Sequence, residues 1–419
     1  MKRKLCTIGL ASFILISHSA ETSNLSVKKN EPAVLQIINH YLVTAGKNEQ
    51  ITGIAASVFV PNDKGSLQGN TKSYFVGKIG WPPYTAPLSK DNLFEIGSIT
   101  KSFAAAIILQ LEAEGKLSIN DALGKWLPQY ENWKDVTIKQ LLNMTSGIPN
   151  YSENENFYKA LEKANFNVDW TNEELLKWAF PEKPIKEQQK NHFHYSNSNY
   201  ILISLIIEKV TGKPFADVLK ARIFEPFQLK NSFYPAGQDG AAIYKKLMPR
   251  MAHGYFYDQD KKKRVDITGN NLSWAGAAGA IISDTVDVVR WVQILFHGEL
   301  FDNAHRKAAL DELTTVISTK TGQAIPTVSK DETDGFGLGV VYMYDKQTEN
   351  RYWSYKGSTL GYRVMYLFSP CNNIVVTVAL NNKAGEGEPN SPMGDAIKAL
   401  TLDIYKSIIQ AYPAYSCKN

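Results

Sequence analysis

Hydrophobic and polar positions alternate with two different periods along the chain. Residues 32–45 carry apolar side chains at helical spacing, which predicts an amphipathic helix near the N-terminus. Residues 51–60 and 72–79 are rich in β-branched and aromatic side chains, which are typical of strands. The polar, glycine-containing residues 61–71 lie between these two segments, so the pair is predicted to form a hairpin.

The middle of the chain has mainly helical spacing, and strand patterns return only near its end. Helices are predicted at residues 98–114, 138–144, 172–180, 199–210, 215–224, 285–296 and 393–409. Late strands are predicted at residues 337–344, 351–355, 362–368 and 373–380. Because the early and the late strands each lie beside a terminal helix, we expect an α+β fold with one antiparallel sheet built from both chain ends. A large, mostly helical segment is then inserted as a second lobe.

The boundaries of these parts follow from the same pattern. The sheet lobe is expected to comprise about residues 30–95 and 300–419, and the helical lobe about residues 96–299. Both lobes belong to one predicted domain, residues 20–419. Binding sites favour the seam between lobes, and the helix predicted at residue 98 begins where the chain first crosses that seam.

The first 19 residues have the pattern of a secretory signal peptide. Lys2, Arg3 and Lys4 precede an apolar run, and Ser17 and Ser19 have the small-residue spacing of a cleavage site. Removing the three basic residues lowers the formal net charge from +5 to +2, which gives no electrostatic case for nucleic-acid binding. No other stretch approaches the ~18 apolar residues of a membrane span. We therefore expect an exported, periplasmic protein without a membrane span once the signal is removed.

Ser98 and Lys101 form an S-x-x-K pair at the predicted start of an apolar helix. A three-residue step places the hydroxyl and the amine on one helix face, and serine needs a neighbouring base to act as a nucleophile. Burial and the positive end of the helix dipole can make the lysine that base, because both lower its pKa. Ser26 and Lys29 match the same pattern, but in a polar segment with no helix behind it.

Two further segments contain side chains that suit acyl-transfer chemistry. Tyr195 and Asn197 form a Y-x-N pattern, in which a phenol can pass a proton to a leaving group and an amide can hold a substrate amide. Gly357 lies at the end of a predicted strand, where the following backbone N–H can face a developing oxyanion. Each pattern alone is also compatible with a half-buried aromatic residue or an ordinary turn.

Together the three segments resemble those of the serine β-lactamase and penicillin-binding-protein superfamily. The resemblance is greatest to the branch of class C β-lactamases, D-alanyl-D-alanine carboxypeptidases and related esterases. It extends, in order and spacing, to further segments at residues 93–101, 141–149, 211–215, 223–227 and 278–283. Met144 replaces the histidine that is usual in the second of these segments. The resemblance implies a β-lactamase-like fold over residues 20–419.

The resemblance also implies roles for individual residues of this chain. Ser98 would be the acylated nucleophile, Lys101 its base and Tyr195 a proton-relay partner, and whether lysine or tyrosine takes the first proton stays open. Asn197 would contact the substrate amide. The backbone N–H groups of Ser98 and Ser358 would form the oxyanion hole. The implied protein is a serine hydrolase that works through an acyl-enzyme without a metal or cofactor.

The strand-end motif departs from the family at its first position, where lysine or histidine is usual and this chain has Tyr355. A phenol offers a hydrogen bond but no charge at neutral pH. Lys356 carries a charge, but neighbouring side chains of a strand point to opposite faces. Tyr355, Lys356 and Gly357 are nevertheless assigned to the substrate site. The expected substrates are peptidoglycan-derived D-Ala-D-Ala peptides or β-lactam-like amides, with small esters as one alternative and a catalytically idle binding protein as another.

The cysteines and histidines indicate a structural bridge but no metal site. Cys371 and Cys417 remain after signal removal, and such a pair in an oxidising compartment predicts a disulfide, two free thiols being the alternative. His192 and His194 form a pair for which the sequence places no third ligand, so no metal site is predicted. The sequence gives no indication of the number of subunits.

Overall fold

The computed structural model of the chain describes residues 33–258, 263–383 and 396–417. The predicted signal peptide, residues 1–19, lies outside the described residues. The centre of the fold is an antiparallel sheet of eight strands in the order β2-β1-β12-β11-β10-β9-β8-β7. These strands are β1 (Gly53–Pro61), β2 (Gly69–Gly77), β7 (Ile317–Ser318), β8 (Asp334–Phe336), β9 (Val341–Asp345), β10 (Asn350–Ser358), β11 (Arg363–Ser369) and β12 (Ile374–Leu380).

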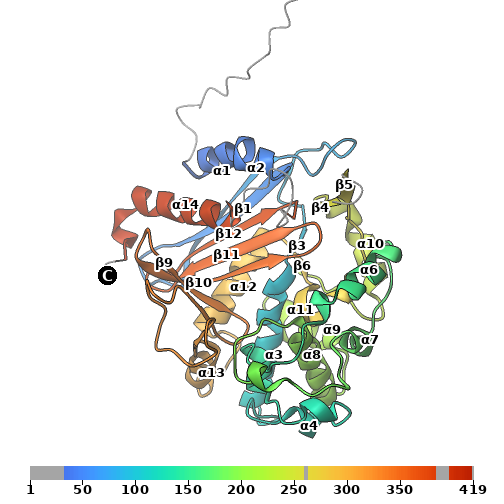
Figure 1. Cartoon of the computed structure of the whole chain (residues 1–419). Coiled ribbons are helices and arrows are strands. Elements are labelled where there is room, and N and C mark those ends of the chain that lie inside the picture. Colours follow the sequence, from blue (N-terminus) through green and yellow to red (C-terminus); the bar gives the residue numbers. More distant parts are fainter. Residues whose placement is uncertain (1–32, 259–262, 384–395, 418–419) are drawn as a thin grey trace, which may run out of the picture.

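The two ends of the chain meet inside this sheet. Strand β1 pairs with β2 on one side and with β12 on the other, so that Ile54 stands opposite Leu380. The terminal helices α1 (Ala33–Val43) and α14 (Ala396–Ala411) lie together on one face of the sheet (Figure 1). This arrangement confirms the predicted α+β architecture with a sheet built from both chain ends.

Both faces of the central strands are buried, which explains their nearly continuous apolar sequences. In β12, Ile374, Val376 and Val378 belong to the core beneath α1 and α14. Val375 and Ala379 belong to the larger core on the other face, as the alternation of strand side chains requires. The helix α12 (Thr285–His297) lies on this second face.

The helices between β2 and β7 form the second part of the molecule (Figure 1). They are α3 (Thr100–Ala113), α4 (Leu123–Trp126), α5 (Ile138–Leu142), α6 (Glu155–Lys163), α7 (Asn172–Lys177), α8 (Asn197–Thr211), α9 (Phe215–Leu219), α10 (Gly240–Leu247), α11 (Gly276–Gly279), α12 and α13 (Arg306–Leu313). The short helix α2 (Ala45–Asn48) instead lies between α1 and β1. Two small sheets join them: β3 (Phe94–Glu95) with β6 (Ile282–Ser283), and β4 (Tyr255–Asp258) with β5 (Lys263–Asp266). Helices α3 and α8 are almost completely buried, as expected for helices that are apolar on most sides.

One predicted strand begins later in the structure than the sequence pattern suggests. The sequence pattern predicts a strand at residues 337–344, whereas β8 ends at Phe336 and β9 begins at Val341. Gly339 has a φ of 73°, and a Cβ there would lie 3.0 Å from the carbonyl oxygen of Lys101. The chain therefore turns at Gly339 because its backbone passes directly against α3, a tertiary contact that strand periodicity does not reveal.

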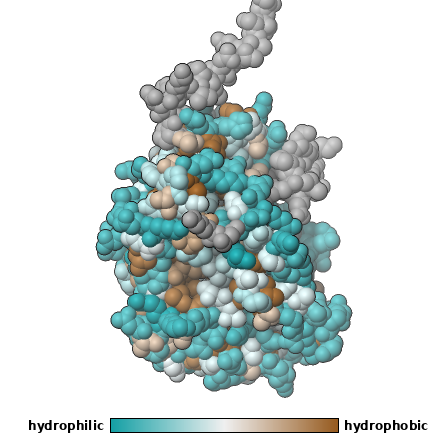
Figure 2. Space-filling model, turned by 90° about the vertical axis from the view of Figure 1, so that its left-hand side faces the viewer, coloured by the Kyte–Doolittle hydropathy of each residue, from teal (hydrophilic) through white to brown (hydrophobic). Residues whose placement is uncertain are grey.

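The surface of the sheet lobe is largely polar. Figure 2 shows the face on the left of Figure 1, on which hydrophobic patches are small and scattered among hydrophilic side chains. Across the described part of the chain, no helix combines the length and the apolar character needed to cross a membrane.

Candidate active site

Ser98 lies in a tight turn that leads into the central helix. The turn η1 (Gly97–Ile99) runs directly into α3, and Ser98 is the one residue of the turn that is partly exposed. Gly97 has a φ of 52°, in the region that favours glycine. A Cβ at Gly97 would lie 2.5 Å from the backbone nitrogen of Ser358. Glycine is therefore required for the turn to approach the end of β10.

Lys101 is fully buried and faces Ser98. Its Nζ atom lies 3.0 Å from Ser98 Oγ and donates a hydrogen bond of 2.6 Å to the carbonyl oxygen of Ala278. No carboxylate of the described residues forms an ion pair with this amine. Burial without a compensating charge lowers the pKa of Lys101 well below its usual value. The structure thus places a weakly basic amine within proton-transfer distance of a hydroxyl.

Tyr195 completes the group from the loop that precedes α8. Its hydroxyl donates a hydrogen bond of 2.8 Å to Ser98 Oγ, and the ring centroid lies 4.9 Å from Lys101 Nζ. Burial raises the pKa of Tyr195 to about 12, so the phenol stays protonated at neutral pH. Beneath this loop the fully buried Met144, at the position where histidine is usual, accepts from the backbone N–H of Ser196 at 3.4 Å.

Two backbone N–H groups meet where η1 touches the end of β10. The backbone N–H of Thr359 donates a hydrogen bond to the carbonyl oxygen of Tyr362. Because successive N–H groups of an antiparallel strand point to alternate sides, the N–H of Ser358 points away from β11. A Cβ on Gly357 would collide with the carbonyl oxygen of Ile96 and lie 3.0 Å from the nitrogen of Ser98. Gly357 therefore allows the close approach that brings the two N–H groups to the same place, as in an oxyanion hole.

Asn197 presents an unpaired carbonyl oxygen beside Tyr195. Its side-chain nitrogen donates to Ser152 Oγ at 2.7 Å, and its backbone nitrogen donates to Asn150 Oδ1 at 3.0 Å. The Oδ1 atom of Asn197 is buried and has no hydrogen-bond partner. Asn150 and Ser152 were not anticipated from the sequence. The signal that points to them is their position directly after the family-like segment at residues 141–149.

Tyr355 faces the site, whereas the nearby positive charges do not. The Tyr355 side chain is only 4% exposed and its oxygen lies 3.2 Å from that of Tyr195. Lys356 is exposed, and strand alternation directs it to the opposite face of β10. Arg363, another possible source of charge, forms a buried ion pair with Glu49. Neither of these two cations therefore faces Tyr355, and Lys101 is the charged side chain that the described residues bring to Ser98.

Glu95 lies in a buried network behind the same strand end. Its Oε1 atom accepts hydrogen bonds from Tyr244 at 2.7 Å and from Asn270 at 2.9 Å. Burial raises the pKa of Glu95 to about 7, although the hydrogen bonds from Tyr244 and Asn270 oppose the rise. Sequence reasoning gave Glu95 no role, because nothing in its local pattern indicates burial.

The structure also relates the cysteines and the possible metal ligands. Cys371 and Cys417 are joined in a disulfide, with 6.0 Å between their Cα atoms. Within the described ranges, no three side chains of histidine, cysteine, aspartate or glutamate gather as metal ligands would.

Comparisons with known proteins show the family of the chain. The Beta-lactamase family matches residues 43–399. Penicillin-binding protein 4* of Bacillus subtilis is 29% identical over 297 residues, which cover 67% of this chain and 59% of that protein. The teichoic acid D-alanine hydrolase of Staphylococcus aureus is 29% identical over 40% of this chain and 37% of its own length. The first of these relatives thus extends well beyond the matched region.

Solved structures agree on the fold. D-amino acid amidase of Ochrobactrum anthropi superposes with a TM-score of 0.72 at 22% identity, covering 90% of this chain and 98% of the amidase. A D-stereospecific amidohydrolase of Streptomyces gives a TM-score of 0.66 at 24% identity over 83% of this chain and 93% of that chain. With the family match over most of its length, the chain belongs to the Beta-lactamase family and has the fold of the serine β-lactamases and penicillin-binding proteins.

Proposed function

We propose that the protein is an exported serine hydrolase that cleaves D-aminoacyl amides and esters through an acyl-enzyme on Ser98. One observation carries this proposal: Ser98 Oγ lies between the amine of Lys101 at 3.0 Å and the phenol of Tyr195 at 2.8 Å. A hydroxyl held between a basic amine and an acidic proton donor is an activated nucleophile. The signal-peptide pattern of residues 1–19 supports export.

The pKa shifts favour Lys101 over Tyr195 as the first base. The buried amine has a lowered pKa and is therefore neutral in a larger fraction of molecules, whereas the phenol has a raised pKa and keeps its proton. Neutral Lys101 accepts the hydroxyl proton of Ser98 as Oγ forms its bond to the substrate carbonyl carbon. Tyr195 then donates its proton to the leaving nitrogen or oxygen, and the proton held on Lys101 restores the phenol.

The remaining groups bind the substrate carbonyl and its neighbouring amide. The negative charge that develops on the carbonyl oxygen faces the N–H groups of Ser98 and Ser358. The unpaired Oδ1 of Asn197 accepts a hydrogen bond from an N–H group of the acyl part. Water then attacks the ester carbon, and Ser98 is released as a hydroxyl while the acid leaves.

The neutral environment of Tyr355 supports this substrate class, since neither Lys356 nor Arg363 faces it among the described residues. A carboxylate beside the scissile bond needs a charged partner to offset its desolvation, and Tyr355 offers only a neutral phenol. D-amino acid amides and D-alanyl esters lack such a carboxylate on the leaving side. The D-amino acid amidase and the teichoic acid D-alanine hydrolase named above act, by their names, on compounds of these two kinds.

A second candidate is cleavage of D-Ala-D-Ala peptides or β-lactams. The similarity to penicillin-binding protein 4* favours it, and the same three side chains would perform the chemistry. It differs from the first candidate in requiring recognition of a carboxylate.

Intact-mass measurement tests the acyl-enzyme, and steady-state kinetics test the substrate class. Fluorophosphonate should add one adduct, which peptide mapping should place on Ser98 and which Ser98→Ala should lose. Penicillin carries a carboxylate, so a rapid and stoichiometric penicillin adduct on Ser98 favours the second candidate. The kcat/KM for D-alanine amide should exceed that for L-alanine amide and for D-alanyl-D-alanine. An adduct on another residue, or none on folded protein, contradicts the mechanism, and a preference for D-alanyl-D-alanine favours the second candidate.

A further inference from the structure

A large cavity lies in the helical part of the molecule, apart from Ser98. It has a volume of about 1040 Å³ and is enclosed by α7, α8, α9 and the segment that precedes α10. Ser98, Lys101, Tyr195 and Tyr355 do not line it. The volume is at the upper end of the range typical of small-molecule sites, so an organic ligand of substantial size fits.

The wall of this cavity is strongly acidic, although the whole chain has a formal net charge of +5. Six carboxylates line it against two lysines. The six are Asp169, Glu173, Glu208, Asp217, Glu225 and Asp239. One lysine, Lys220, already pairs with Glu225 at 3.6 Å. A concave surface that carries one sign of charge concentrates ligands of the opposite sign.

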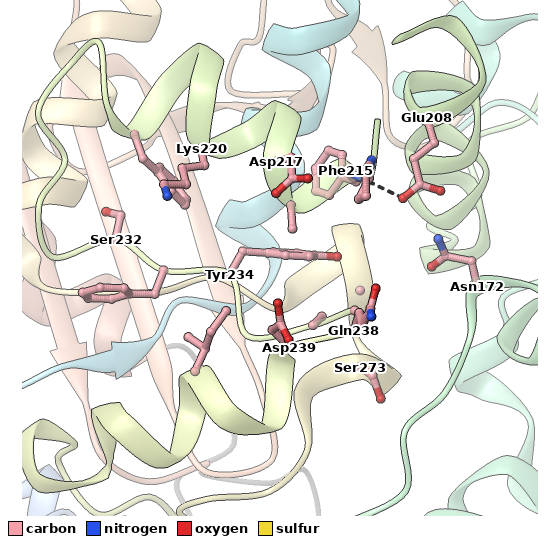
Figure 3. A pocket seen from close by; sticks show the side chains of 18 of the residues that line it. Asn172, Glu208, Phe215, Asp217, Lys220, Ser232, Tyr234, Gln238, Asp239 and Ser273 are labelled. Carbon is pink, nitrogen blue, oxygen red and sulfur yellow. Dashed lines mark hydrogen bonds between the residues drawn. The ribbon is translucent and has the colours of Figure 1, made fainter. Parts of the chain in front are cut away.

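The aromatic side chain of Tyr234 crosses the middle of the cavity. Figure 3 shows its ring extending between Asp217 and Asp239, with Glu208 and Asn172 beyond the ring. Phe215 packs edge-on against the ring, with 5.2 Å between the centroids. An aromatic face flanked by carboxylates attracts an organic cation by two independent interactions, charge pairing and the ring quadrupole.

The carboxylates that flank Tyr234 have no cation of their own. Within the described ranges, neither Asp217 nor Asp239 forms an ion pair. The pKa of Glu208 is raised by burial and by the nearby charge of Glu173, and its hydrogen bond from the backbone of Phe215 at 2.8 Å only partly opposes this rise. The charge of Glu173 thus acts on Glu208, and a cation held near these two carboxylates would offset that repulsion.

A buried polar group in the cavity wall also lacks a partner. The indole N–H of Trp170 is buried and has no hydrogen-bond acceptor. The wall thus combines apolar and aromatic side chains with acidic ones, and it includes one polar group without a hydrogen-bond partner.

We propose that this cavity is a second, non-catalytic site that binds an organic ammonium compound. The ammonium group lies over the ring of Tyr234 between Asp217 and Asp239, and the apolar stem packs against Phe215. The proposal does not depend on the catalytic function, because it rests on side chains outside the Ser98 site.

Calorimetric titration with cadaverine tests the site. Cadaverine should bind the whole protein, and binding should weaken as NaCl rises from about 50 to about 500 mM, because exposed charge pairs are screened. The neutral diol of the same chain length and the dicarboxylate glutarate should not bind. Ser98→Ala should bind as wild type does. Absent cadaverine binding, or equal binding of the diol, overturns the proposal.

Matched variants locate the binding. The double variant Asp217→Asn, Asp239→Asn keeps the shape of the wall and should weaken cadaverine binding at least about tenfold, whereas Asp403→Asn on α14 should leave it unchanged. Tyr234→Leu should weaken binding at least about threefold, and Tyr234→Phe, which keeps an aromatic face, less than that. Thermal unfolding shows whether each variant folds. Unchanged affinity in the folded double variant overturns the assignment.

Discussion

The phenol oxygens of Tyr195 and Tyr355 lie 3.2 Å apart, although 160 residues separate them in the chain. A cation at position 355 would favour ionised Tyr195 and lower its pKa. The neutral phenol found there leaves the pKa of Tyr195 raised to about 12. Burial is the main cause of this raised pKa, and the hydrogen bond with Tyr355 lowers it only in part. The residue that departs from the family pattern therefore leaves Tyr195 protonated at neutral pH.

Tyr355→His should move the preference of the enzyme toward substrates that carry a carboxylate. Charge-assisted hydrogen bonds are roughly twice as strong as neutral ones, so kcat/KM for D-alanyl-D-alanine relative to D-alanine amide should rise about fivefold to tenfold. Histidine has an ordinary pKa of about 6.5 and carries a positive charge only when it is protonated. The rise should therefore be larger at pH 6 than at pH 8.

Tyr355→Phe is the matched control for this change, since it keeps the ring and adds no charge. In Tyr355→Phe, the ratio of kcat/KM for D-alanyl-D-alanine to kcat/KM for D-alanine amide should stay within about twofold of the wild-type ratio. Equal shifts in both variants would mean that loss of the Tyr195 contact, and not charge, controls selectivity.

Lys101→Met should lower the rate of acylation of Ser98 by about 10²–10⁴ while the protein stays folded. Methionine has a similar length and needs no hydration, so the unfolding temperature should not fall. Stopped-flow acylation with a chromogenic ester measures the rate. Lys139→Met removes a surface lysine that pairs with Glu312 at 2.8 Å and should leave the acylation rate unchanged. A Lys101→Met rate within about tenfold of wild type would assign the base elsewhere.

Glu95 should make the protein less stable as the pH rises through neutrality. Its pKa is raised from 4.5 to about 7 in the folded state, so the stabilisation present below pH 4.5 is lost as the pH rises toward and past 7. This pKa shift corresponds to a decrease of up to about 3 kcal/mol in the free energy of unfolding. Glu95→Gln cannot titrate.

Urea unfolding of wild type and Glu95→Gln at several pH values checks this sign. The free energy of unfolding of wild type should fall relative to the variant between pH 4.5 and pH 8.5. Glu187→Gln, at an exposed position of the 3-10 turn Glu187–Gln189, should track wild type at every pH. A constant difference between wild type and Glu95→Gln would show that the folded protein does not hold Glu95 protonated.

The disulfide between Cys371 and Cys417 should stabilise the C-terminal end of the chain. It closes a step of 46 residues, for which chain entropy predicts roughly 3–4 kcal/mol. Replacing both cysteines by serine should lower the free energy of unfolding by about this amount. Thiol titration of unfolded, unreduced wild type should find neither of these two thiols reactive, and two reactive thiols would contradict the bridge.

The pattern of apolar residues along the chain was enough to predict the main helices and strands, and the local spacing of Ser98 and Lys101 was enough to predict that these two side chains lie close together. The sequences of α3, α8 and β12 are apolar over most of their length because each element is buried on most sides. Ser98 and Lys101 lie one helical step apart, so their proximity is a local property. Tyr195 was placed beside them by the resemblance, since no local pattern relates residues so far apart in sequence.

Other parts of the site depend on contacts that residue type does not reveal. Ala278 holds Lys101 through its backbone carbonyl, which any residue would provide. Asn150 and Ser152 orient Asn197 from a loop whose course is set by packing. The turn at Gly339 and the burial of Glu95 likewise result from neighbours distant in sequence.

The meeting of both chain ends in one sheet has a consequence for biosynthesis. The N–H of Ser98 is complemented by that of Ser358, and β10 is held in place by β11 and β12, the last strands to be made. A chain still emerging from the ribosome has already made Ser98 and Lys101 but lacks this support. Such long-range pairing forms late. If Ser98 acts as proposed, we expect a chain truncated before β10 to carry this serine without its reactivity.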